Sequence, residues 1–360
     1  MYHPRFYGDF YEMGFKYGSL LHQKGVQLPA LTQAKAEFGT QCYQALQRFY
    51  PELIEEIKGF SAGLRVEEAF LGAFVAGIGV FDMTGKCSAF GFRNTNAVVF
   101  GRNYDMLFAL KQFTESSLTA PAHKFAHISQ SDLFLGRADG INEKGLAIAM
   151  SFVNGTTIQP GITFHFIIRK VLENCDTVAS AVETIRSAKI TSANNFLIAD
   201  KQGTLAVVEA APEGSEVRYP QYGDSFVCIS NQFETEKMTA FDRGGLNWSK
   251  TKERYQKLES TLSAAESIDL DCAKEIMSDR CVCLNLKKEK FGTLWSVVAD
   301  LKALKIERAE GKPKIDNYKP ETRLDWWLKK RAAKTNGIKL FSMVSTAPKT
   351  ENCECYKTRI

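Results

Sequence analysis

The spacing of apolar residues changes once along this chain, near residues 84–87, and this change limits the folds that it can adopt. Before that point, four apolar residues recur at intervals that place them on one face of a helix. They follow Pro51, a residue favoured in the first turn of helices, and are Leu53, Ile57, Phe60 and Leu64. A second, shorter helix is predicted from Tyr11 to Leu21. The first 85 residues are therefore predicted to be helical.

After residue 87, apolar residues come in short continuous runs, which are typical of buried strands. The runs cover residues 97–100, 146–150, 196–199, 205–209, 226–230 and 293–299. Asp200–Gly203 separates two of them and is predicted to be a hairpin turn. Asn142–Gly145 is likewise predicted to be a tight turn, with Gly145 at positive φ. Because the runs do not alternate with polar residues, we expect helices to cover at least one face of each sheet.

Two helices are predicted between the earlier and the later strands. The first runs from about Thr163 to Leu172, and the second begins after Asp176, which is its expected N-cap. The order of helices, strands, two helices and further strands differs from the regular alternation of a doubly wound parallel sheet. The sequence instead predicts an α+β fold in which sheets are layered with helices.

Composition and charge exclude several classes of partner. The net charge is only +5 over 360 residues, and no basic stripe is interleaved with aromatic residues, so no nucleic-acid partner is expected. No run approaches the roughly 18 apolar residues of a membrane span. Met1–Arg5 lacks the layout of a secretory signal, and the nine cysteines are expected to be reduced thiols. A cytoplasmic protein is therefore predicted.

Motifs for metals and cofactors are missing from the sequence. Cys281–Cys283 and Cys353–Cys355 are C-x-C pairs with no second ligand pair nearby, so no metal is expected. There is no phosphate-binding loop, no dinucleotide-binding glycine motif and no G-x-S-x-G. His165 falls within an apolar helical pattern and is predicted to be a hydrogen-bonded core residue. No cofactor is predicted.

What remains is a series of polar motifs that contains no histidine. Cys87 follows Gly85 and Lys86, and Asp105 lies 18 residues further along the chain. The motifs, in order, are Gly101–Asp105, Asp139–Ala147, Ser192–Asp200, Ile229–Phe233 and Trp248–Tyr255. No single motif is specific for one protein family. Their joint order behind a cysteine is specific.

In this order the motifs resemble those of the acyl-CoA:isopenicillin N acyltransferase (6-aminopenicillanic acid acyltransferase) family. These are N-terminal nucleophile cysteine hydrolases, related to choloylglycine hydrolases and penicillin V acylases. The likeness extends from Tyr11–Gly14 to about Pro313. It implies a four-layer αββα sandwich and cleavage of the chain between Lys86 and Cys87. The implied parts are a helical pro-segment or small subunit packed on the core, the αββα catalytic core and a basic C-terminal extension: residues 1–86, 87–310 and 311–360.

The resemblance also implies a role for each polar residue. Cys87 would supply the thiolate, and its freed α-amine would act as the base, since an α-amino pKa of about 7.7 is close to working pH. Asp105 would orient that amine. Arg102 would favour the thiolate, as a neighbouring cation does for reactive cysteines. Asn231 would donate a hydrogen bond to the developing oxyanion.

Three further residues have assignments that rest on looser matches. Arg254 corresponds to the family's late active-site arginine. Ser151 would offer a backbone N–H to the oxyanion, and Asn195 would be a structural amide near the site. The predicted protein is thus a zymogen-like, self-cleaving amidase (hydrolase) or acyltransferase with an S-acyl intermediate on Cys87. Its expected partner is a small amide or thioester, with acyl-CoA as one candidate co-substrate and a homo-oligomer as a candidate assembly.

Two alternatives to a self-cleaving enzyme stay open, because the family places glycine directly before the nucleophile and this chain has Lys86 there. An uncleaved chain would act as a binding or scaffold protein, for which the basic, tryptophan-bearing segment after Gly311 is a second argument. A histidine-dependent cysteine hydrolase would instead need a histidine beside Cys87. The three candidates for that partner are His123, His127 and His165.

Individual residues also have purely structural alternatives. Arg102 and Asp105 could form an ion pair at the end of a strand. Asn194 and Asn195 could close a turn. Arg254 could be one charge on an exposed helix, and the basic run 329–331 could be a solvated helix face.

Overall fold

The computed structural model describes residues 1–80 and 85–344, with side chains described as far as residue 333. It divides into two compact units, Met1–Glu321 and Thr322–Ile360. Thr84, where the apolar spacing was predicted to change, and the Cys353–Cys355 pair lie outside the described residues. Within the described ranges, no helix combines the length and the apolar character needed to cross a membrane.

The N-terminal part of the first unit is helical, as predicted. A short strand is followed by four helices: β1 (Arg5–Gly8), α1 (Phe10–Gln23), α2 (Gln33–Phe49), α3 (Pro51–Leu64) and α4 (Glu68–Gly77). Pro51 occupies the first turn of α3, and the four apolar residues predicted for one face of this helix are all buried. The predicted helix from Tyr11 to Leu21 lies within α1.

Helices α1 and α3 pack with their backbones in close contact, because each carries two glycines four residues apart. These are Gly14 and Gly18 on α1, and Gly59 and Gly63 on α3. A Cβ atom added at Gly14 would lie 2.0 Å from the carbonyl oxygen of Glu56, and one added at Gly59 would lie 2.1 Å from that of Tyr11. Real Cβ atoms do not approach a backbone so closely. These four positions therefore require glycine if the two helices are to pack at this distance.

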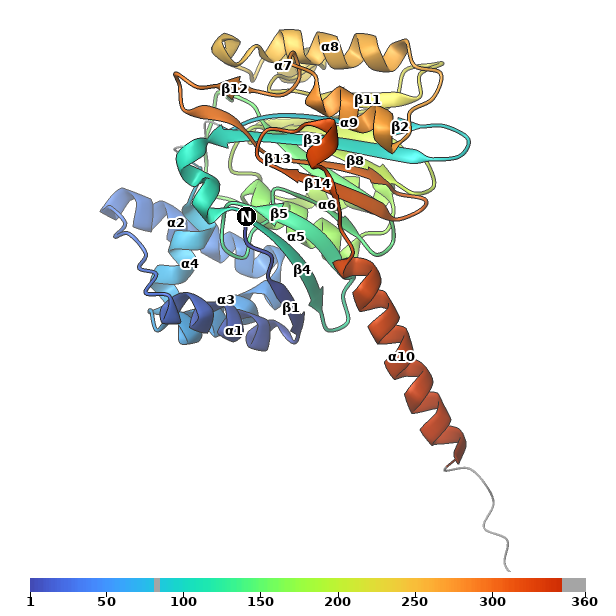
Figure 1. Cartoon of the computed structure of the whole chain (residues 1–360). Coiled ribbons are helices and arrows are strands. Elements are labelled where there is room, and N and C mark those ends of the chain that lie inside the picture. Colours follow the sequence, from blue (N-terminus) through green and yellow to red (C-terminus); the bar gives the residue numbers. More distant parts are fainter. Residues whose placement is uncertain (81–84, 345–360) are drawn as a thin grey trace, which may run out of the picture. The chain divides into compact units, whose positions relative to one another are not determined.

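Two sheets form the centre of the first unit (Figure 1). The first has the order β1-β4-β5-β6-β7-β8-β9-β10 and is antiparallel except for the β1–β4 pair. Its remaining strands are β4 (Glu115–Pro121), β5 (His127–Ser131), β6 (Asp139–Asn142), β7 (Leu146–Phe152), β8 (Asn194–Asp200), β9 (Leu205–Ala211) and β10 (Gly214–Arg218). The second has the order β11-β2-β3-β13-β14-β15, with β12 paired to β13. Its strands are β2 (Lys86–Arg93), β3 (Val98–Leu107), β11 (Phe226–Ile229), β12 (Asn285–Leu286), β13 (Phe291–Asp300), β14 (Lys305–Glu310) and β15 (Lys319–Pro320).

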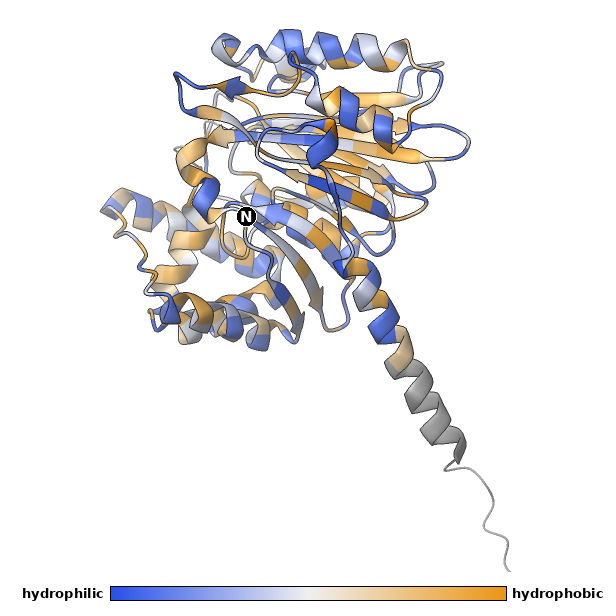
Figure 2. Cartoon of the chain, viewed as in Figure 1, coloured by the Kyte–Doolittle hydropathy of each residue, from blue (hydrophilic) through white to orange (hydrophobic). Residues whose placement is uncertain are grey.

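Helices cover the outer face of each sheet. Helices α5 (Phe164–Asn174) and α6 (Val178–Ser187) pack on β6 to β9, and α8 (Thr251–Ser263) and α9 (Leu270–Ser278) pack on the second sheet. The inner faces of the sheets meet where β2 and β11 contact β7, β8 and β9. Figure 2 shows the hydrophobic residues gathered in the two sheets, with hydrophilic residues on the outside of α8. The predicted α+β, four-layer αββα sandwich is confirmed.

Both predicted turns are present. Gly145 has φ of +79° and Gly203 has φ of +94°, values that glycine adopts without strain. In the second turn, Oδ1 of Asp200 accepts hydrogen bonds from the backbone nitrogens of Gln202 and Thr204. The six predicted strands correspond to β3, β7, β8, β9, β11 and β13. The run at 97–100 begins one residue before β3, and the run at 226–230 extends one residue beyond β11.

Two local predictions are wrong. The N-cap of α6 is Thr177 rather than Asp176, because the Thr177 hydroxyl accepts from the backbone nitrogen of Ser180 in a capping box. His165 is buried in α5 as predicted, but its ring nitrogens have no hydrogen-bond partner among the described residues. The nearest charged atom is an Asp132 oxygen at 3.7 Å, and the ring stacks on Phe164.

A buried network of charged groups links the N-terminal helices to the first sheet and α5. Arg169 of α5 forms ion pairs with Glu173 of the same helix, at 2.8 Å, and with Glu56 of α3. Glu173 also accepts from the hydroxyl of Tyr50, between α2 and α3. The network also includes a 2.6 Å hydrogen bond from the Tyr17 hydroxyl of α1 to Glu115 of β4. Glu115 in turn forms an ion pair with Arg137. Residues before and after position 86 thus share one polar core.

The remaining elements are short, apart from the last helix. They are the turns of 3-10 helix η1 (Phe108–Phe113), η2 (Asn247–Ser249) and η3 (Ile315–Asn317), and the single-turn α7 (Glu236–Thr239). The second unit contains α10 (Arg323–Val344). This helix includes the basic run 329–331, and Lys329 pairs with Asp325 one turn before it at 2.7 Å.

Candidate active site

Cys87 is the second residue of β2 and lies at the end of the strand that faces the polar residues of the predicted site. Its register is fixed by β3, where Tyr104 is the partner of Cys87 and Asp105 is the partner of Lys86. The Cys87 side chain is 1% exposed. β11 pairs with β2 only from Ala89 to Phe92, so at Cys87 the position in the sheet is fixed by β3.

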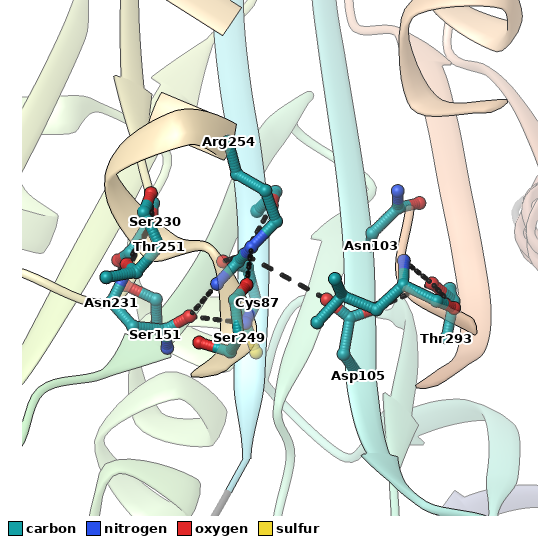
Figure 3. A network of polar contacts seen from close by, with 12 residues as sticks. Cys87, Asn103, Asp105, Ser151, Ser230, Asn231, Ser249, Thr251, Arg254 and Thr293 are labelled. Carbon is teal, nitrogen blue, oxygen red and sulfur yellow. Dashed lines mark hydrogen bonds and ion pairs between the residues drawn. The ribbon is translucent and has the colours of Figure 1, made fainter. Parts of the chain in front are cut away.

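Asn231 and Arg254 bind the backbone of Cys87 (Figure 3). The backbone nitrogen of Cys87 donates to Oδ1 of Asn231 at 3.0 Å. Nη1 of Arg254 donates to the Cys87 carbonyl oxygen at 2.7 Å, and Nη2 donates to the same Asn231 oxygen at 2.7 Å. Nδ2 of Asn231 is directed at carbonyl oxygens, those of Phe152 at 2.8 Å and Gly85 at 3.5 Å. The segment around the Lys86–Cys87 bond is thus held by a buried amide and a buried guanidinium.

The start of α8 brings Asn231 and Arg254 together. Asn231 lies two residues after β11, and its backbone nitrogen donates to Oγ of Ser230 at 2.7 Å and to Oγ1 of Thr251 at 2.9 Å. Thr251 is the first residue of α8, and Arg254 lies one turn further on the same helix. Nε of Arg254 donates back to the carbonyl oxygen of Ser249 at 3.0 Å. One helix terminus therefore positions the side chains of both Asn231 and Arg254.

Asp105 lies on the other side of Arg254, as Figure 3 shows. Its Oδ1 accepts from the hydroxyl of Thr293 at 2.5 Å, and Nη1 of Arg254 is 4.0 Å from its Oδ2. Oδ2 has no hydrogen-bond partner among the described residues. Burial raises the pKa of Asp105 to about 6, against the opposing effects of Arg254 and Thr293. This carboxylate has one oxygen available for a further donor.

Arg102 is completely buried and acts on the Cys87 thiol through its charge. Burial raises the pKa of Cys87, and the nearby Arg102 guanidinium is the largest effect in the opposite direction. Nε of Arg102 pairs with Asp139 at 3.2 Å, and Asp139 also accepts from Nε1 of Trp295 at 2.8 Å. The alternative of an Arg102–Asp105 ion pair is therefore wrong, since each residue pairs elsewhere.

Lys86 precedes Cys87 and is buried to the same extent, with 1% of its surface exposed. Its Nζ lies 5.2 Å from the ring centroid of Trp248 and 5.5 Å from that of Phe152. Burial lowers the pKa of Lys86 to about 8. The bond between Lys86 and Cys87 therefore lies inside the molecule.

The sequence of this core matches a known family. Residues 92–315 match the acyl-coenzyme A:6-aminopenicillanic acid acyl-transferase model, a segment that begins after Cys87 and includes Asp105, Asn231 and Arg254. The chain belongs to this family. The predicted relationship is confirmed, and membership in this acyl-transferase family makes the protein an enzyme of amide hydrolysis or acyl transfer.

Three solved structures are among those similar to this acyl-transferase family member. Penicillin V acylase from Agrobacterium tumefaciens is 17% identical, with 62% of this chain and 83% of that chain covered and a TM-score of 0.46. A variant of the conjugated bile acid hydrolase from Clostridium perfringens is 17% identical, with coverage of 62% and 89% and a TM-score of 0.47. The Caenorhabditis elegans orthologue of N-acylethanolamine-hydrolyzing acid amidase is 19% identical, with coverage of 60% and 93% and a TM-score of 0.45. No curated protein matches the chain significantly in sequence.

In this acyl-transferase family member, Ser151 and Asn195 hold the segment that carries Asn231. They are cross-strand partners on β7 and β8. The Ser151 hydroxyl donates to the carbonyl oxygen of Ser230, and Nδ2 of Asn195 donates to Ser151 Oγ at 3.1 Å and to the Gln232 carbonyl oxygen at 2.9 Å. Asn194 and Asn195 begin β8, so the alternative that they close a turn is wrong. Arg254 is buried, so the alternative of an exposed helix charge is also wrong.

His127 has partners other than Cys87. His127 is hydrogen-bonded to Ser129 at 3.0 Å and to Glu173 at 3.4 Å, and burial lowers its pKa to about 4. Among the described residues, no hydrogen bond joins His123, His127 or His165 to Cys87. The geometry therefore does not support a histidine-dependent mechanism. The described residues also contain no group of three His, Cys, Asp or Glu side chains placed to bind a metal ion.

Sequence reasoning missed several residues of the site. Thr293 was predicted only as part of a strand, and its contact with Asp105 follows from the β13–β3 register. Thr251 and Trp248 lie in a motif from which only Arg254 was assigned a role. Phe152 directly follows Ser151, at the end of β7. The register of β13 with β3 is the signal that could have identified Thr293.

Proposed function

We propose that this protein is a self-cleaving cysteine amide hydrolase or acyltransferase that forms an S-acyl intermediate on Cys87. The observation that carries the proposal is the pair of contacts from Asn231 and Arg254 to the backbone of Cys87. A structural cysteine needs no such arrangement. The contacts fix the backbone nitrogen and the carbonyl oxygen of Cys87. This is the residue whose own amide bond to Lys86 would be broken.

Self-cleavage is an N-to-S acyl shift between Lys86 and Cys87. Sγ of Cys87 attacks the carbonyl carbon of Lys86, and the thiol proton passes to the departing nitrogen. The C–S bond forms and the C–N bond breaks, which leaves the lysyl carbonyl on sulfur and an α-amine on Cys87. Water then hydrolyses the thioester to the Lys86 carboxylate and the free thiol. Residues 1–86 and 87–360 become separate chains.

The freed α-amine then serves as the base for external substrates. Its ordinary pKa is about 7.7, so it can accept the thiol proton near neutral pH. The open Oδ2 of Asp105 is available to hold this amine, and the charge of Arg102 favours the thiolate. We assign Nδ2 of Asn231 as the hydrogen-bond donor to the oxyanion of the substrate. It can take this role once the segment before Cys87 has left the site.

Turnover repeats the same bond changes on a small amide or thioester. The thiolate attacks the carbonyl, the amine or thiol leaves with the proton from the α-amine, and an acyl group remains on sulfur. Water as the acceptor gives hydrolysis. An amine as the acceptor gives acyl transfer, for which acyl-CoA is a candidate donor.

Intact-mass measurement of the purified full chain tests the proposal. We expect masses for residues 1–86 and 87–360 in the wild type, and one uncleaved mass for Cys87→Ala. Incubation of the cleaved enzyme with a panel of amides and thioesters should add an acyl mass to the fragment that begins at Cys87. A wild-type chain that stays intact and acquires no acyl group would contradict the proposal.

The second candidate is an uncleaved binding or scaffold protein, and the specific observation in its favour is the burial of both Lys86 and the Cys87 thiol. Self-cleavage distinguishes the two. The binding candidate predicts that Cys87→Ala behaves as the wild type does in mass and in every functional assay.

A further inference from the structure

The ammonium group of Lys86 has an aromatic binding site in the uncleaved chain. Lysine is almost never fully buried without a partner, yet Lys86 is buried and forms no ion pair within the described part of the chain. Instead, its Nζ lies within the cation–π range of about 6 Å from the rings of both Trp248 and Phe152. Burial lowers the pKa of Lys86, whereas Cys87 and Asp105 act in the opposite direction and Arg254 lowers it further.

The two rings belong to the segments that build the candidate active site. Phe152 ends β7, and its carbonyl oxygen accepts from Nδ2 of Asn231 at 2.8 Å. Trp248 lies in η2, directly before Ser249 and α8. Its ring is held edge-on against Phe291, with centroids 5.2 Å apart and an interplanar angle of 84°. Trp248 is 46% exposed, so this side of the site reaches the surface.

Self-cleavage makes the lysyl group of Lys86 the first acyl group on the Cys87 sulfur. Every later substrate must bring its own carbonyl carbon to the same sulfur atom, which β2 holds in a fixed position. When Lys86 leaves, the volume beside the two rings becomes available to the acyl part of a substrate.

We propose that the place of the Lys86 side chain is the acyl pocket of the mature enzyme, and that its preferred substrates are amides or thioesters whose acyl group ends in an ammonium on an aliphatic chain. Lysyl amides are the simplest members of this class. The inference rests on the proposed function, because it requires the Lys86–Cys87 bond to be cleaved and Cys87 to be acylated.

Three matched fluorogenic amides test the substrate class on the cleaved enzyme. They are the aminomethylcoumarin amides of Nα-acetyl-lysine, Nα-acetyl-norleucine and Nα-acetyl-glutamate, which place a cation, a neutral chain and an anion in the pocket. We expect kcat/KM for the lysyl amide to exceed that for the norleucyl amide about tenfold, as a partly desolvated cation–π site allows. The glutamyl amide should be the poorest of the three.

Variants of Trp248 identify the source of the preference. Trp248→Leu should bring the lysyl-to-norleucyl ratio close to one, and Trp248→Phe should keep most of it, because it retains a ring. Tyr222→Ala removes a fully exposed aromatic residue elsewhere and should leave the ratio unchanged. A wild-type ratio of one or less, or a ratio that survives Trp248→Leu, overturns the inference.

The first turnover gives an independent measurement that needs no external substrate. Lys86→Arg keeps a cation and should cleave itself at close to the wild-type rate, whereas Lys86→Met keeps the length but loses the charge and should cleave about tenfold more slowly. Equal rates for Lys86→Met and the wild type would overturn the inference even if Trp248→Leu fails to fold. Loss of self-cleavage and of all amide turnover in the wild type would overturn the proposed function itself, whereas turnover without a lysyl preference overturns only the acyl pocket.

Discussion

Oδ1 of Asn231 lies 3.0 Å from the backbone nitrogen of Cys87 and accepts its hydrogen bond. In the proposed reaction this nitrogen is an amide before cleavage and an amine afterwards, and in both forms it carries a hydrogen for Asn231. Nη2 of Arg254 donates to the same oxygen at 2.7 Å, which fixes the orientation of the amide. The orientation of the Asn231 side chain therefore does not depend on whether the chain has been cleaved.

Asn231→Ala removes both the acceptor for the Cys87 nitrogen and the assigned oxyanion donor. We expect amide turnover by the cleaved enzyme to slow by about a hundredfold or more, the range found when one oxyanion donor is lost. Self-cleavage should also slow, because the Cys87 nitrogen loses its acceptor. A time course of intact masses after synthesis measures it. Asn285→Ala, at an exposed asparagine of β12, is the matched control and should cleave normally. Normal cleavage of Asn231→Ala would remove Asn231 from the mechanism.

The pKa of Asp105 predicts the acid limb of the reaction. Burial raises this pKa to about 6, and the proposed role requires the ionised carboxylate. Amide turnover by the cleaved enzyme at pH 5 should therefore be at least about tenfold slower than at pH 7, since a tenth of the carboxylate is ionised one pH unit below its pKa. Asp105→Asn should be at least a hundredfold slower at both pH values, roughly the contribution of one acid–base group. A rate that does not change between pH 5 and 7 would contradict this role.

The same residue makes folding stability depend on pH. Because the pKa of Asp105 in the folded protein is about 6 and its ordinary value is 3.8, the folded state binds this proton more tightly. Its contribution to stability is fully present below the lower value and is lost as the pH rises through about 6. Urea denaturation of Cys87→Ala and of Cys87→Ala/Asp105→Asn at pH 4 and 7 should show that this loss is absent from the double variant.

Arg169 neutralises two carboxylates that are buried between α3 and α5. Arg169→Met would leave Glu56 and Glu173 without their cation, and we expect a loss of about 3–5 kcal/mol in the free energy of unfolding. Urea denaturation in the uncleaved Cys87→Ala background measures it. Lys58→Ala breaks an exposed pair with Glu55 and should lower the free energy of unfolding far less than Arg169→Met does. Similar losses for the two variants would show that the buried network has little effect on stability.

Gly59→Ala tests the close contact between α1 and α3. Helix propensity alone would make this change stabilising by about 1 kcal/mol. The added Cβ would lie 2.1 Å from the Tyr11 carbonyl oxygen, so we expect a net destabilisation of about 1–3 kcal/mol, seen as a lower Tm. Ala62→Gly, at an exposed position of the same helix, should lose only about 1 kcal/mol. A higher Tm for Gly59→Ala would show that the helices can move apart.

Apolar patterns made most of the core predictable, but they do not reveal strands built from polar residues. Helix α3 and strands β7 to β9 follow regular apolar patterns and were predicted. Strand β4 was missed because it buries Glu115, Ser116, Ser117 and Thr119. Glu115, Ser116 and Thr119 have hydrogen-bond partners elsewhere in the chain, which are Tyr17, Gln130 and Arg137.

The candidate site shows the same division. Cys87, Asp105, Asn231 and Arg254 belong to motifs that a sequence displays. The contact between Thr293 and Asp105 spans 188 residues and exists only because β13 returns beside β3. The aromatic contacts of Lys86 arise in the same way, since Phe152 and Trp248 come from separate segments that meet only in the folded chain.

The polar core shared by residues on both sides of position 86 has a consequence for molecularity. Tyr17 and Glu56 belong to one product of the proposed cleavage, and Glu115 and Arg169 belong to the other. Unfolding of the intact chain involves one molecule, whereas unfolding of the cleaved protein releases two. The midpoint of denaturation would then rise with protein concentration, and refolding would become a second-order encounter between two fragments. Cleavage would thus turn a reversible folding reaction of one molecule into a refolding reaction that becomes slower as the protein is diluted.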